Sequence, residues 1–142
     1  MKKIQMMFAT VLVALMAFAV QSCGSDDKNV SSSAQYKVSA SLVFQDQAGL
    51  TNDQVKQLQE GFKREETGEY LTDNLAATAG QQIVNATKST VEASMSNAGN
   101  PKGKFTITII VTKLSSNSQI AKWEIVYDNG SVSTNTIQKP AA

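Results

Sequence analysis

A four-residue turn near the C-terminus constrains the fold more than any other stretch of this chain. Asp128-Asn129-Gly130-Ser131 is a hairpin signal, because Asn-Gly accepts the positive φ angles of a type I′ turn. Before it, residues 120–128 alternate between apolar and polar side chains, as a half-buried strand does. The turn therefore predicts that residues 132–137, which are rich in threonine, return as a last strand at the edge of a sheet.

Residues 104–114 show the same period-two pattern, so they predict the strand that precedes this hairpin. A loop through residues 115–118 brings the two apolar faces into register without adjustment. The register predicts three inward pairs: Val111 with Ala121, Ile109 with Trp123, and Ile107 with Ile125. Trp123 and Tyr127 have the spacing of a sugar-stacking platform, but we expect them in the core, because Ile125 lies between them.

The N-terminal part of the domain predicts one strand followed by a helix. Residues 35–44 alternate, with apolar side chains at every second position from Tyr36 to Phe44. Thr51 and Gln54 have the spacing of a capping box, and Leu50 can pack on Val55, so a helix is expected to begin at Asn52. This helix weakens over residues 63–68.

Helical spacing resumes over residues 69–98 and predicts one long helix. Thr67 or Thr72 could cap its start, and Gly99 followed by Pro101 marks its end. Small side chains would let it lie close to a sheet; they are Ala76, Ala79, Gly80 and Ala86. The predicted buried stripe comprises Leu71, Leu75, Ala79, Ile83, Thr87, Val91 and Met95, widened by Val84 and Ala86.

The predicted order of elements is β-α-α-β-β-β, in a single domain over residues 35–137. We expect an α+β fold: an antiparallel four-stranded sheet with one long and one shorter helix packed on one face. A sheet wrapped on a long helix is similar in outline to cystatin-like folds. The Gln-x-Val-x-Gly motif of those inhibitors is absent as such, and its nearest echo, Gln82-Ile83-Val84-Asn85-Ala86, lies within the predicted helix. A cystatin-like inhibitor is therefore an alternative that rests on architecture only.

The N-terminus has the three parts of an export signal over residues 1–22. Lys2 and Lys3 give a positive start, residues 6–20 form an apolar run, and Gln21-Ser22 is a polar exit. The apolar run is shorter than the roughly 20 residues that a membrane span needs. Val20-Gln21-Ser22 leads directly into Cys23, the only cysteine, and this arrangement resembles the lipobox of bacterial lipoproteins.

The resemblance implies cleavage before Cys23 and attachment of acyl chains such as palmitate to its thiol and to the new amino terminus. Two or three acyl chains hold a protein stably on a membrane. We therefore expect an outer-membrane lipoprotein, with residues 23–34 as a flexible tether and residues 138–142 as a tail. Ser25-Asp26-Asp27 resembles the export signal of surface-exposed lipoproteins of Gram-negative bacteria, and a plain solvated linker is the other interpretation.

Charge and residue types exclude several functions. Without Lys2 and Lys3 the 13 basic residues fall to 11, against 12 acidic ones, so we expect no nucleic-acid partner. The chain has no histidine, which removes Ser-His-Asp and Cys-His catalysis and the commonest zinc ligand. No glycine-rich phosphate loop precedes a predicted helix. We predict a protein that is not an enzyme and that has no cofactor and no metal.

The catalytic alternative rests on a group of carboxylates near the junction of the two predicted helices, comprising Glu60, Glu65, Glu66 and Glu69. Two of them could serve a hydrolase of envelope glycans if their carboxyl groups lay about 5 to 9.5 Å apart. Lys63 and Arg64 lie among them, and charge runs of this kind usually mark exposed surface with local ion pairs. We therefore keep the hydrolase only as an alternative.

The candidate binding residues lie on the outward side of the predicted sheet and comprise Thr106, Thr108, Ile110, Thr112, Lys122 and Glu124. This side is rich in hydroxyl groups, carries little charge and includes exposed aliphatic side chains. It adjoins the edge strand at residues 132–137, whose backbone could accept a partner strand. We expect it to bind a protein or glycan of the cell envelope or a second copy of the chain. Threonine rows are also ordinary strand formers, so a plain solvated face is the alternative.

Overall fold

A computed structural model of the chain describes residues 33–46, 51–97, 99–100 and 102–140. The predicted signal peptide, Cys23 and all but the last two residues of the predicted tether lie outside the described residues. Within the described ranges, no helix is long and apolar enough to cross a membrane.

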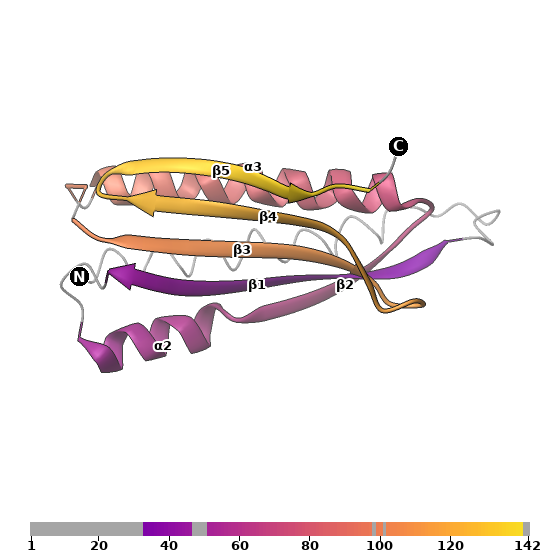
Figure 1. Cartoon of the computed structure of the whole chain (residues 1–142), viewed down its shortest axis with the longest axis horizontal. Coiled ribbons are helices and arrows are strands. Elements are labelled where there is room, and N and C mark those ends of the chain that lie inside the picture. The colour runs from indigo at the N-terminus through magenta and orange to yellow at the C-terminus, as the bar shows by residue number, and fades with distance from the viewer. Residues whose placement is uncertain (1–32, 47–50, 98, 101, 141–142) are drawn as a thin grey trace.

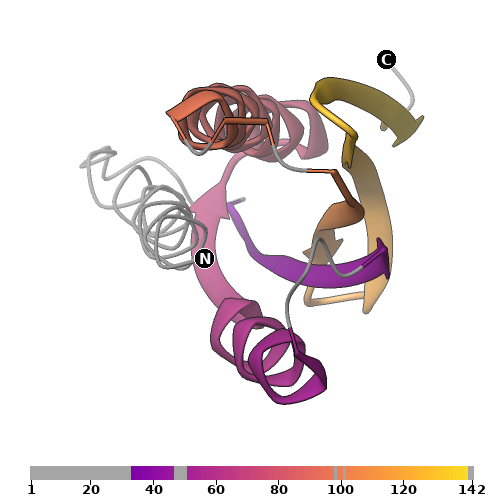
Figure 2. The same cartoon turned by 90° about the vertical axis from the view of Figure 1, so that its left-hand side faces the viewer.

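Five antiparallel strands form one sheet, in the order β2-β1-β3-β4-β5 (Figure 1). The strands are β1 (Ala34–Asp46), β2 (Arg64–Tyr70), β3 (Lys104–Lys113), β4 (Ser118–Asp128) and β5 (Ser131–Gln138). The helix α3 (Asp73–Asn97) lies along one face of this sheet, and α2 (Asn52–Phe62) lies beside β1 in line with β2. The sheet curves strongly, so that α3 and β5 come side by side (Figure 2).

The expectation of a four-stranded sheet with two helices packed on one face is wrong. Residues 64–68 were expected to be a helix junction and residues 69–70 the start of the long helix. Together they form β2, which pairs with β1 from Ala34 opposite Tyr70 to Ala40 opposite Arg64. Of the two described helices, α3 packs along the sheet face, whereas α2 contacts β1 at the edge and adds Val55 to the core. The sequence of β2 does not alternate between apolar and polar residues. Such alternation is not needed here, because backbone pairing with β1 holds this edge strand, which buries little of its own surface.

The hairpin of β3 and β4 has the register that the sequence predicts. Val111 lies opposite Ala121, Ile109 opposite Trp123, and Ile107 opposite Ile125. Trp123 and Tyr127 are fully buried, which confirms that they belong to the core. The following turn has positive φ angles at Asn129 (50°) and Gly130 (103°), as the Asn-Gly signal predicts. Gln138, expected in the tail, is the last residue of β5.

The long helix begins four residues later than predicted. The backbone N–H of Leu75 donates to Thr72 Oγ1 at 3.1 Å, so Thr72 is the cap. At the other end, Gly99 adopts a φ of 84°, and the Asn100 N–H donates to the Met95 carbonyl at 2.8 Å. The predicted stripe is confirmed from Ala79 onward at every fourth residue.

The predicted stripe is wrong at Leu71, Leu75 and Ala86, which are exposed. Leu71 precedes the helix, and the face that meets the sheet is centred on Ala76, Gly80 and Val84. Gly80 allows the closest approach. A Cβ atom there would lie 2.8 Å from Trp123 Cζ3 and 2.9 Å from Val111 Cγ2, closer than carbon atoms normally come.

Candidate functional site

All six residues predicted to bind lie on the face of the sheet that points away from α3. Along β3, buried side chains such as Ile107 and Ile109 face the helix, and the residues between them face the other way and are half-buried. Lys122 and Glu124 of β4 point to this same face. We call this surface the outer face; it comprises Thr106, Thr108, Ile110, Thr112, Lys122, Glu124 and Val126, together with Lys37, Ser39, Ser41 and Val43 of β1.

Strand register places these side chains in short rows across the sheet. Thr108 lies between Ser41 of β1 and Glu124 of β4. Ile110, two residues further along β3, lies in the next row, between Ser39 and Lys122. Side chains in directly opposed positions are about 4.5 to 5.5 Å apart at Cβ, so each row is a continuous contact surface. Thr108 and Ile110 therefore present hydroxyl and methyl groups in the middle of the outer face, with Glu124 and Lys122 directly beside them on β4. Lys37 adds a further positive charge in the row of Thr112.

A third row adds Val43, an aliphatic side chain that was not expected on this face. Thr106 lies between Val43 of β1 and Val126 of β4, and its Oγ1 donates to Gln45 Oε1 at 3.2 Å. Val43 is 51% exposed, which is high for a valine within a strand. The signal was available, because Val43 falls on the polar side of the alternation over residues 35–44.

No described helix covers the outer face. The contacts of α3 with β3 and β4 are made through the opposite face of the sheet, where the core cluster lies. The other described helix, α2, contacts β1 at the edge of the sheet. In the part of the chain that the structure describes, the outer face is therefore open to a partner.

The two edges of the sheet differ in charge. The edge strand β2 carries Arg64, Glu65, Glu66 and Glu69 within seven residues, whereas β5 carries no charged residue within eight. Charged side chains on an edge strand discourage pairing with other chains. The edge at β5 lacks this protection, and Ile137 on it is 52% exposed.

The four glutamates of the hydrolase alternative do not converge. Glu60 lies in α2 and the other three in β2, where Glu65 and Glu66 point to opposite faces because neighbouring strand residues alternate. Glu65 and Glu69 share a face, but four residues of strand separate their Cα atoms by about 13 Å. Glu65 Oε2 forms an ion pair with Lys37 Nζ at 3.2 Å, which is a contact between the paired strands β2 and β1.

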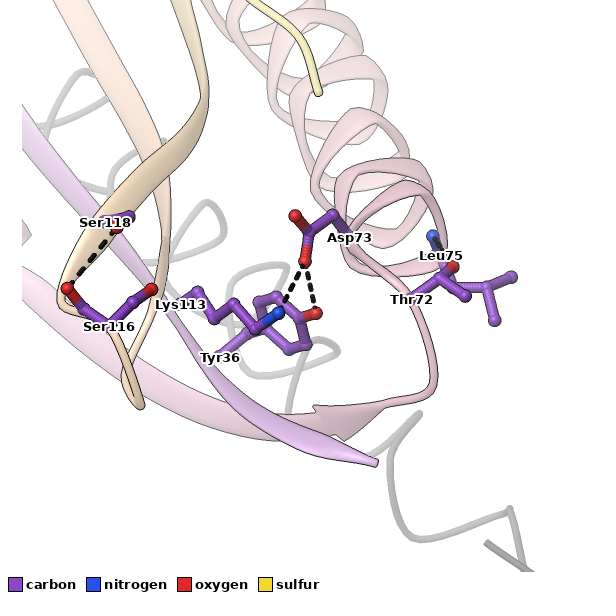
Figure 3. Close-up of polar contacts among 7 residues, drawn as sticks. All are labelled: Tyr36, Thr72, Asp73, Leu75, Lys113, Ser116 and Ser118. Carbon is purple, nitrogen blue, oxygen red and sulfur yellow. Dashed lines mark hydrogen bonds and ion pairs between the residues drawn. The ribbon is translucent and has the colours of Figure 1, made fainter. Parts of the chain in front are cut away.

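A second polar cluster joins α3 to the sheet at the start of the helix (Figure 3). The Tyr36 hydroxyl donates to Asp73 Oδ1 at 2.6 Å, and Lys113 Nζ lies 3.4 Å from the same oxygen. Asp73 is the first residue of α3, where a negative charge is favourable against the helix dipole. The cluster ties the N-terminus of α3 to both β1 and β3.

The contact between Tyr36 and Asp73 shifts the pKa values of both groups, in opposite directions. The hydrogen bond from Tyr36 lowers the pKa of Asp73, and Lys113 lowers it further, against the opposing effect of burial. Burial and the Asp73 carboxylate raise the pKa of Tyr36, so the phenol stays protonated and donates. Because Tyr36 is 1% exposed, its hydroxyl is shielded from solution, and its bond to Asp73 serves to join β1 to α3.

Among the described residues, no three of the acidic and cysteine side chains lie together as metal ligands would. Comparison with known proteins gives no relative: no protein-family model, no curated protein and no solved structure matches the chain.

Proposed function

We propose that this chain is a lipid-anchored protein of the bacterial cell envelope that acts as a non-catalytic binding module. The outer face is its docking surface, and its partner is another envelope protein. The observation that carries the proposal is that this face, with Thr108 and Ile110 at its centre, is left uncovered by the described helices. Small-molecule sites are usually concave, whereas a wide, open sheet face suits the surface of a protein.

The chemistry of the outer face supports a protein partner. Its centre is uncharged and carries the aliphatic groups of Ile110, Val43 and Val126, and interface centres are depleted of charged residues. Lys122 and Glu124 lie on one side and can give orientation through opposite charges. The edge strand β5 carries no charged residue, but α3 lies beside it, so the proposal rests on the face of β1, β3 and β4 and not on the addition of a partner strand.

The lipid anchor is part of the proposal and rests on the sequence alone. A signal-like segment over residues 1–22 ends at the only cysteine of the chain. A tether of about a dozen residues would then separate the membrane from β1. A protein held in this way meets its partner at a high effective concentration, so even a modest interface can be occupied.

A charge-reversal pair on the outer face tests the docking surface. Thr108→Lys with Ile110→Glu places two charges at its centre, and Ser89→Lys with Ala93→Glu places the same charges on the exposed side of α3. Each full-length variant is affinity-purified from cross-linked envelopes of its native host, after circular dichroism has shown that it folds. We expect the wild type and the α3 variant to recover the same partner, and the outer-face variant to lose it. Equal recovery by all three would reject this surface.

A further inference from the structure

A pocket of about 380 Å³ lies between the first half of α3 and the end of β5, on the helix side of the sheet. This volume falls within the range of about 300 to 1,000 Å³ that is usual for small-molecule sites. Its walls come from α3, β4 and the segment that follows β5. The lining residues are Asn74, Ala77, Thr78, Gln81, Trp123, Lys139 and Pro140.

Hydrogen bonds hold the α3 wall of the pocket in place. Trp123 Nε1 donates to Gln81 Oε1 at 2.9 Å, and Gln81 Nε2 donates to Asn85 Oδ1 at 3.1 Å. Thr78 Oγ1 donates to the Asn74 carbonyl at 2.9 Å, which leaves the lone pairs of the hydroxyl as acceptors. An amide side chain has two donor hydrogens and two acceptor lone pairs, so Gln81 keeps one of each for a ligand.

The opposite wall is held by a pair of hydrogen bonds between β5 and β4. Gln138 Nε2 donates to the Gln119 carbonyl at 2.7 Å, and Gln119 Nε2 donates to Gln138 Oε1 at 2.6 Å. Because Gln138 is fixed in this way, Lys139 and Pro140 follow from a defined position. Thr78 and Gln81 are therefore positioned before any ligand arrives, which reduces the entropic cost of binding.

The lining has a definite chemical character. Lys139 gives it one positive charge, and no acidic residue is among the residues that line it. Asn74, Thr78 and Gln81 supply neutral donors and acceptors along one side of α3. Ala77, the edge of the Trp123 ring and Pro140 supply apolar surface. A complementary ligand has one negative charge, several hydroxyl groups and an apolar side.

We infer that this pocket binds a single carboxylated sugar ring of the uronic acid class. The sugar carboxylate pairs with the Lys139 ammonium, and the ring hydroxyls bond to Asn74, Thr78 and Gln81. The carbon-hydrogen side of the ring lies against Ala77 and Pro140. This site is separate from the outer face, since it lies on the other side of the sheet, and it does not rest on the proposed function.

Trp123 provides the assay, because it is the only tryptophan of the chain and its indole borders the pocket. Full-length protein in detergent is titrated with glucuronate and with glucose, and tryptophan fluorescence and binding heat are recorded. We expect a saturable signal with glucuronate and binding at least about tenfold weaker with glucose, since one charge-assisted hydrogen bond is lost. No saturable binding heat with glucuronate, or equal affinity for glucose, would overturn the assignment.

Two variants and two controls locate the site. Lys139→Gln should weaken glucuronate binding about tenfold, and Thr78→Phe should abolish it by filling the pocket. Lys122→Gln and Thr108→Phe make the same changes on the outer face and should leave the affinity unchanged. If Lys139→Gln and Thr78→Phe bind glucuronate as the wild type does, the ligand binds elsewhere and the inference fails. Loss of the protein partner in the outer-face variants with sugar binding intact would separate the two sites.

Discussion

Replacing Gly80 by alanine sets two physical effects against each other on α3. At an exposed helix position this change stabilises a protein by about 1 kcal/mol, because alanine has the higher helix propensity. At Gly80 the new methyl group would lie 2.8 Å from Trp123 Cζ3, 2.9 Å from Trp123 Cη2 and 2.9 Å from Val111 Cγ2. Trp123 and Val111 are buried, and the indole is tied to Gln81, so neither can move aside easily.

Overpacking of a core costs about 1 to 3 kcal/mol, which exceeds the gain in helix propensity. Gly80→Ala should therefore lower the free energy of unfolding by about 1 kcal/mol, or the melting temperature by about 4 to 8 °C. Urea and thermal unfolding followed by circular dichroism measure both. Ala86→Gly, at an exposed position of the same helix, calibrates propensity and should cost about 1 kcal/mol.

The indole contact itself is tested by a double-mutant cycle. Trp123→Phe removes the two ring carbons that the new methyl group would meet, so Gly80→Ala should cost less in that background than in the wild type. A stabilisation by Gly80→Ala of the size expected from propensity alone would refute the reasoning. It would mean that α3 does not lie this close to β3 and β4.

Three further predictions concern the polar cluster at Asp73, the turn at Gly130 and the lipid anchor. The pKa of Asp73 is lowered in the folded state, so its contribution to the free energy of unfolding is complete above the unfolded pKa of about 3.9 and is lost as pH falls through the folded pKa. The stability of Asp73→Asn should therefore depend less on pH in acid unfolding, and a pH profile equal to that of the wild type would contradict this. Gly130→Ala, at a φ of 103°, should lower the free energy of unfolding in urea by about 1 to 2 kcal/mol, whereas Ser131→Ala, at an exposed position, should lower it little. Equal stabilities of the two variants would contradict a turn that requires a positive φ at Gly130. Cys23→Ala should move the protein from the membrane fraction to the aqueous phase on detergent partition, and an unmodified Cys23 in the intact mass of the wild type would reject the anchor.

Sequence periodicity predicted the parts of the fold in which one face of a strand is buried. The register of Ile109 against Trp123 followed from two alternating segments and a short loop, because a slip by one residue would expose both apolar faces. The Asn129-Gly130 turn followed from backbone chemistry alone. The strand at residues 35–44 was found for the same reason as the hairpin.

The strand β2 could not be predicted in this way. Its residues, from Arg64 to Tyr70, do not alternate between apolar and polar types, and what holds them is backbone pairing with β1, a partner distant in sequence. The error at β2 also displaced the expected start of the long helix, which placed Leu71 within the helix and in the core, although it precedes α3 and is exposed. Leu75 lies within α3, on a side of the helix that is exposed. It precedes the buried Ala79 by four residues, and this spacing alone does not show that the two side chains differ in burial.

The candidate outer face was located from the sequence because alternation assigns each side chain to a face. Its contribution from Val43 was missed, although the same alternation contained it. The pocket could not be predicted, since Gln81, Trp123 and Lys139 come from three separate segments. Only the curvature of the sheet, which brings the end of β5 to α3, places them together (Figure 2).

Photo-cross-linking in living cells tests the docking surface most directly. A photoreactive amino acid is introduced singly at Thr108, at Ile110 and, as the control, at the exposed Ser89 of α3 in the full-length chain. Irradiation should give the same discrete adduct with a second protein from Thr108 and Ile110 and none from Ser89. No adduct from either outer-face position, or an identical adduct from all three positions, would contradict the proposal that the outer face is where this protein binds its partner.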